Sequence, residues 1–93
     1  MAYNEPGAAQ RRCRRLVVRE KGIVRMHDTD LEVMVLVLSP MGALIDFGRK
    51  IVLRKKEILK LSLEPADSIV RLQFKGAVVQ CRDNLVGVEF VPQ

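Results

Sequence analysis

The sequence contains few of the residues on which catalysis and base stacking depend. It has no tryptophan, one tyrosine and three phenylalanines among 93 residues. Because proteins that bind single-stranded nucleic acid usually stack bases on aromatic side chains, this scarcity argues against nucleic acid as a partner. A single histidine and scattered acidic residues form no Ser-His-Asp set, carboxylate pair or metal cluster. We therefore predict that the chain is not an enzyme and holds no metal or cofactor.

Long apolar runs and paired cysteines are missing as well. The longest apolar run, residues 33–38, has six residues, far fewer than a membrane-spanning helix needs. The N-terminus has no apolar segment of the kind found in signal peptides. Cys13 and Cys81 show neither the spacing of metal ligands nor a disulfide framework. These absences predict a cytoplasmic protein with no membrane span.

Positive charge is concentrated at the N-terminal end of the chain. Residues 1–25 hold seven Lys or Arg against two acidic residues, whereas residues 26–93 hold nine of each sign. Four arginines fall within residues 11–15. A guanidinium group is planar, permanently charged and forked, so it suits phosphates and the edge of guanine. The pattern predicts a basic arm that binds an anion.

The rest of the chain is typical of an all-β protein. Apolar and polar residues alternate in short segments separated by Pro, Gly, Asn and Asp, with no convincing helical period. We expect six or seven antiparallel strands in a barrel or sandwich. The segments that suggest strands are residues 16–18, 23–26, 33–38, 43–46, 58–64, 70–81 and 86–90.

Several local features carry more specific expectations. Residues 33–38 are apolar and rich in valine, which predicts a strand buried on both faces. Gly76 indicates a β-bulge, and residues 48–56 suggest either a strand edge or a single helical turn. Residues 1–9 are predicted to be a disordered leader, and residues 10–93 a single domain that includes the arginine arm.

Three segments together resemble the signatures of one family. Residues 11–15 fit an RxxxR pattern whose ends are Arg11 and Arg15, although a register of Arg15 and Arg19 also fits. Residues 37–42 fit the spacing of [Asp/Asn]-x-Ser-x-x-Gly, and residues 87–90 (Gly-Val-Glu-Phe) resemble a characteristic closing strand. In this order the segments resemble the PilZ domain, a bacterial receptor for cyclic di-GMP. The resemblance implies a six- or seven-stranded antiparallel PilZ-like β-barrel with a flexible basic N-terminal arm.

The resemblance also implies a ligand-binding site made by the arm and one turn. Arg11 and Arg15 would contact the phosphates and guanines of a stacked, dimeric cyclic di-GMP, and the arginines between them would add charge or flank the stack. The turn would contribute a serine hydroxyl that contacts the ligand and a glycine that allows either a backbone conformation or a close approach that a Cβ would block. The implied ligand-binding residues are Arg11, Arg12, Arg14, Arg15, Ser39 and Gly42.

One position departs from the family pattern. Val37 stands where the signature has Asp or Asn, and valine has no hydrogen-bonding group for the guanine edge. The loss of that bond is expected to cost about 1–3 kcal/mol, or roughly ten- to a hundredfold in affinity. Taken without the resemblance, Val37 is interpreted as a core residue, and residues 39–42 as an ordinary turn between strands.

Three functions are consistent with these features. The first is a cyclic di-GMP receptor that orders its arginine arm over the dinucleotide and so signals to a protein partner. The second is a degenerate PilZ-type adaptor that binds a protein, or a second copy of the chain in a homodimer, without nucleotide; Val37 favours it. The third is a small basic barrel that binds nucleic acid through the arm, which the scarcity of aromatics disfavours.

Overall fold

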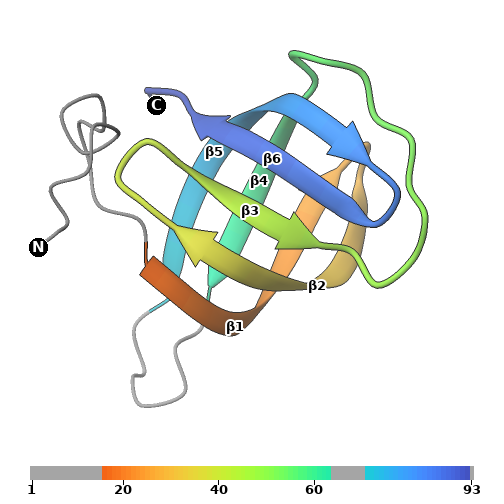
Figure 1. The fold of residues 1–93 in the computed structure, drawn as a ribbon. Helices are drawn as coiled ribbons and strands as arrows, with labels where there is room; N and C mark the ends of the chain where they lie inside the picture. Colours follow the sequence, from red (N-terminus) through yellow and green to blue (C-terminus); the bar gives the residue numbers. More distant parts are fainter. Residues whose placement is uncertain (1–15, 64–70, 93) are drawn as a thin grey trace, which may run out of the picture.

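Six antiparallel strands close into a barrel in the computed structural model, which describes residues 16–63 and 71–92 (Figure 1). The order around the barrel is β1-β2-β3-β6-β5-β4. The strands are β1 (Leu16–Met26), β2 (Thr29–Leu38), β3 (Gly42–Asp46), β4 (Ile58–Leu63), β5 (Leu72–Arg82) and β6 (Leu85–Phe90). The all-β barrel predicted from the sequence is confirmed, with six strands. The leader and the arginine arm lie outside the described residues.

The core forms because every second residue of a strand points into the barrel. On β4, Leu59, Leu61 and Leu63 are almost completely buried, as the alternation in the sequence predicts. One end of the barrel is filled by Phe74 and Phe90, whose stacked rings have centroids 4.5 Å apart. Within the two described ranges, no helix is long and apolar enough to cross a membrane.

The first strand is longer than the sequence suggested. Residues 16–18 and 23–26 were predicted as separate strands, but both belong to β1. A register shift between Val17 and Glu20 marks a bulge, where Arg19 adopts a left-handed conformation with φ of 50°. Such a bulge inserts an extra residue without ending the ladder, which is why the polar residues between the two segments do not break the strand.

Two further expectations about the strands are wrong. Residues 33–38 are not buried on both faces: Val33 and Val35 are buried, while the residues that alternate with them are half-buried on the outside of the barrel. Gly76 is not at a bulge, because it pairs in register with Leu59. The register shift of β5 lies between Val78 and Gln80.

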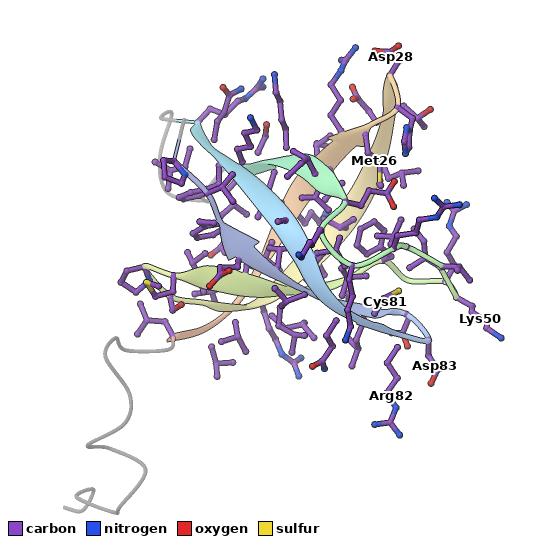
Figure 2. The ribbon with its side chains drawn as sticks, turned by 90° about the horizontal axis from the view of Figure 1, so that it is seen from above. Met26, Asp28, Lys50, Cys81, Arg82 and Asp83 are labelled. Carbon is purple, nitrogen blue, oxygen red and sulfur yellow. The ribbon has the colours of Figure 1, made fainter. Side chains whose placement is uncertain are left out.

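The segment from Phe47 to Glu57 is neither a strand edge nor a helical turn; it is an irregular connection from β3 to β4. Figure 2 shows Lys50 on this connection, on the same side of the barrel as Asp83 in the β5–β6 turn. Backbone hydrogen bonds hold the two together, since the Ile51 amide donates to the Asp83 carbonyl at 2.9 Å. Local propensity could not predict this path, because it depends on contacts with a distant turn.

Acid should weaken the hydrogen bonds by which Asp46 holds the β3–β4 connection to the β5–β6 turn. The Asn84 side-chain amide and the Gly48 backbone amide donate to Asp46 Oδ1 at 2.7 and 2.8 Å. These bonds hold the pKa of Asp46 below its usual value of 3.8, the Asn84 bond having the larger effect. A carboxyl whose pKa is lowered by folding stabilises the fold above its unfolded pKa and loses that effect as pH falls through the folded value.

We therefore expect Asp46→Asn to lower the urea midpoint more at pH 6 than at about pH 3, because below its usual pKa the Asp46 carboxyl of the unfolded chain takes up a proton and the folded state gains less from the ionised form. The matched control is Asp28→Asn, which removes the same charge at an exposed turn position whose φ of 61° asparagine also tolerates. A difference between wild type and Asp46→Asn that is equal at both pH values would contradict this assignment.

Candidate functional site

The turn between β2 and β3 is organised by Ser39. Its Oγ accepts hydrogen bonds from the backbone amides of Met41 and Gly42 at 3.2 and 3.1 Å and donates to the Gly42 carbonyl at 3.3 Å. The Ser39 amide also donates to the Gly42 carbonyl at 2.9 Å. A hydroxyl can donate one hydrogen bond and accept two, so the three bonds within the turn occupy every position of the Ser39 hydroxyl. The hydrogen bonds of the Ser39 side chain therefore fix the conformation of the turn.

Gly42 lets β3 approach β6 closely. A Cβ built on Gly42 would lie 2.1 Å from the carbonyl oxygen of Val88, which no real Cβ contact permits. The adjoining turn is also tied to the end of β6, because the Phe90 amide donates to the Met41 carbonyl at 2.7 Å. Of the two reasons expected for a glycine at position 42, the close approach is therefore present, and the group approached is the backbone of its own barrel.

Gly42→Ala should destabilise the fold by about 2–3 kcal/mol, because the new methyl group must push two paired strands apart. Urea unfolding measures the change. Gly87→Ala is the matched control: it lies on the neighbouring strand, and its Cβ would meet Val79 Cγ2 at an ordinary 3.7 Å. Equal losses of stability in the two variants would show that the approach to Val88 is not what requires glycine at position 42.

A bulge in β2 turns Val37 to the outside of the barrel. Val35 pairs with Ile45, both buried, but a register shift follows and Val37 pairs with Leu44. On its other side Val37 pairs with Val17, which is 78% exposed. The interpretation of Val37 as a core residue is therefore wrong: it is half-buried in an outward-facing row across β1, β2 and β3.

We call Val17, Val37 and Leu44 the outer apolar row. A polar side chain at position 37 would therefore point outward from the barrel, beside the Ser39 turn, where it would be accessible to a ligand. Leu16 and Met41 extend the apolar surface at this end of the barrel, and each is 55% exposed. Sequence analysis missed Val17 and Leu44, because the pairing that places them beside Val37 depends on bulges that no single segment of the chain specifies.

The structure brings the start of β1 next to the Ser39 turn. Leu16, the first residue of β1, pairs with Leu38, the last residue of β2. Ser39 follows Leu38 in the chain, and Arg15 precedes Leu16. The four arginines of the predicted site lie outside the described residues, so only the point where the arm joins the barrel is fixed. That point is at the same end of the ladder as the turn.

Comparison with known proteins agrees with the sequence signatures. A family model described as the PilZ domain matches residues 9–93, which includes the arginine arm and all six strands. Among curated proteins, no match to this chain is found.

Proposed function

Because the chain belongs to the PilZ domain family, we propose that it is a receptor for cyclic di-GMP that closes its arginine arm over the ligand. PilZ domains are binding and adaptor domains rather than enzymes, and the family is generally one of cyclic di-GMP receptors. The proposal for this chain goes further, because it assigns the ligand to the end of the barrel where β1 begins and β2 ends.

The pairing of Leu16 with Leu38 is the observation that carries this assignment. It puts Leu16, the residue that follows the arm in the chain, beside the Ser39 turn, although the two are more than 20 residues apart in the sequence. Arg11 and Arg15 are proposed to meet the phosphates and the O6 and N7 atoms of guanine. Arg12 and Arg14 would add positive charge around them.

Ser39 and Gly42 are proposed to support the site by fixing the shape of the turn. The Ser39 hydroxyl already makes three hydrogen bonds within the turn. Gly42 lets β3 lie close against β6, and the Phe90 amide ties the turn to β6 through the Met41 carbonyl. The outer apolar row is proposed to pack against a guanine face, and the arginines to supply the charge-assisted bonds. Each such bond is worth about 1.5–3 kcal/mol where water is partly excluded.

Titration calorimetry of the full chain with cyclic di-GMP tests the proposal, with cyclic di-AMP as the matched ligand. Adenine presents a donor in place of the guanine O6 acceptor, so an arginine fork binds it less well. We expect saturable heat with the guanine dinucleotide and much less with the adenine one. Equal heats for the two ligands, or none for either, would contradict the receptor function.

A second function is favoured by the exposed apolar residues at the same end. Val17, Leu16 and Met41 offer a surface for a protein partner, and Val37 adds to it where the family has a polar residue. A degenerate PilZ adaptor would use this surface without nucleotide. Absence of cyclic di-GMP binding by the natural chain, together with its appearance in Val37→Asn, would favour the adaptor.

A further inference from the structure

A hollow on the outside of β1, β4 and β5 carries a second concentration of positive charge. It has a volume of about 630 Å³. Five cationic side chains line it, and Asp30 is the one acidic residue among its described lining residues. The cationic residues are Lys21, Arg25, Lys60, Arg71 and Lys75.

Strand register aligns the charges in rows. Arg25 on β1 is the direct partner of Lys60 on β4, and Lys60 is the direct partner of Lys75 on β5. Three cations therefore stand side by side, with neighbouring strands about 4.8 Å apart. Like charges directly opposite one another destabilise a sheet, so this row does not serve the stability of the barrel.

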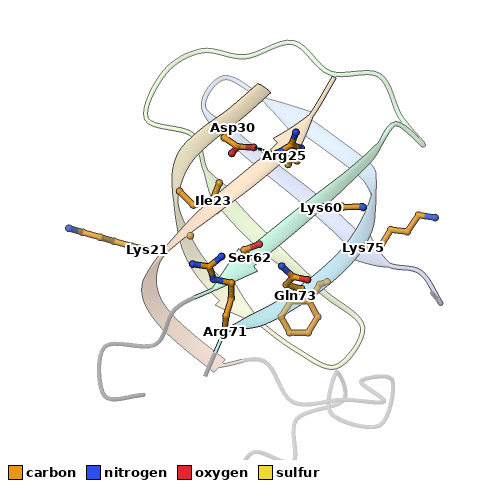
Figure 3. Close-up of a pocket in the computed structure, with 11 residues that line it drawn as sticks. Lys21, Ile23, Arg25, Asp30, Lys60, Ser62, Arg71, Gln73 and Lys75 are labelled. Carbon is orange, nitrogen blue, oxygen red and sulfur yellow. Dashed lines mark hydrogen bonds and ion pairs between the residues drawn. The ribbon is translucent and has the colours of Figure 1, made fainter. Parts of the chain in front are cut away.

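The next outward-facing row of the hollow is uncharged. Ile23 pairs with Ser62, and Ser62 pairs with Gln73. Figure 3 shows Ser62 and Gln73 between cationic side chains, with Arg71 beside Ser62 and with Lys60 and Lys75 on the other side. The floor of the hollow thus offers the side chains of Ser62 and Gln73, which can form hydrogen bonds, beside the apolar Ile23, with cationic groups toward both ends.

Acidic residues limit the hollow on the β2 side. Asp30 is the cross-strand partner of Arg25, and Asp30 Oδ1 lies 3.4 Å from Arg25 Nη1. Glu32 on the same strand pairs with Ile23. An anion is therefore repelled from β2 and attracted toward β4 and β5, where Lys60 and Lys75 lie.

We propose that this hollow binds the phosphodiester backbone of a nucleic acid without reading its bases. Lysine and arginine only donate hydrogen bonds, and phosphate oxygens only accept them. An extended acidic peptide is a poorer fit, because its backbone amides also need acceptors and the closed barrel has no free strand edge to provide them. No aromatic platform is required, since the contact is with phosphates and not with base faces.

Fluorescence anisotropy with a labelled, mixed-sequence oligonucleotide of about 20 nucleotides, single-stranded and as a duplex, tests this binding. In the full chain, Lys60→Gln with Lys75→Gln should weaken binding about tenfold at about 50 mM salt and lower the slope of log K against log salt by about 1.4–2. The matched control is Lys50→Gln with Lys55→Gln, which removes the same charge from exposed positions on the β3–β4 connection. Every variant keeps the arginine arm.

Two outcomes would overturn the proposal. One is equal binding by the Lys60/Lys75 variant and the Lys50/Lys55 control. The other is equally strong competition by polyglutamate or by phosphatidylserine vesicles, which would mean that the hollow takes any anionic partner. Urea unfolding checks that the Lys60/Lys75 variant is folded; its midpoint should not fall, since neighbouring like charges are removed. Cyclic di-GMP binding by this variant should be unchanged. A failure of the nucleic-acid proposal can therefore be told apart from a failure of the receptor function.

Discussion

Arg15→Ala is expected to lower the affinity for cyclic di-GMP by about ten- to a hundredfold. Arg15 immediately precedes Leu16, whose pairing with Leu38 places the end of the arm beside the Ser39 turn. Loss of its charge-assisted bonds to phosphate or guanine should cost about 1.5–3 kcal/mol. Calorimetry on the full chain measures the dissociation constant.

Arg82→Ala is the matched control for charge. Arg82 is an exposed arginine at the β5–β6 turn, and Figure 2 shows its side chain projecting away from the barrel. Its removal lowers the net charge by the same amount, far from the proposed site. If both variants lose affinity equally, the ligand responds only to overall charge and the assignment of Arg15 is wrong.

Val37→Asn is expected to raise the affinity by about ten- to a hundredfold. Val37 lies on the outer apolar row, between Val17 and Leu44, so a carboxamide there would face the ligand and not the core. It would restore a hydrogen-bond partner for the guanine edge, worth about 1–3 kcal/mol. The same substitution should cost at most about 1 kcal/mol of stability, because asparagine is a poorer strand residue than valine.

The control for this gain is Val52→Asn, the same chemical change at a position that is 84% exposed on the β3–β4 connection. It should leave affinity unchanged. A gain in both variants would mean that added surface polarity, and not a contact at position 37, is responsible. No gain in Val37→Asn would show that this position does not face the bound ligand.

Sequence alone predicted the elements whose patterns are local. The alternation of Leu59, Leu61 and Leu63 against polar neighbours predicted β4 and its buried face. The polar residues 27–30 predict a turn, and the structure has one at His27 and Asp28, which both adopt left-handed conformations, while β2 begins at Thr29. In both cases a few consecutive residues are enough to specify the local structure.

Features that depend on distant partners were predicted poorly. The outward direction of Val37 results from a bulge at its pairing with β3, and no pattern within β2 marks that bulge. Gly42 was expected to allow a close approach, but only the structure identifies the Val88 carbonyl as the neighbour. The cationic row of Arg25, Lys60 and Lys75 joins three strands whose order around the barrel is not evident from the sequence.

The most direct test of the account is a titration of the isotope-labelled full chain with cyclic di-GMP, followed by backbone amide NMR. The account predicts saturable shifts that are largest at Val17, Val37 and the Ser39 turn, together with changes at Arg11 and Arg15. Shifts centred instead on Lys60 and Lys75, or an unchanged spectrum at saturating ligand, would contradict it.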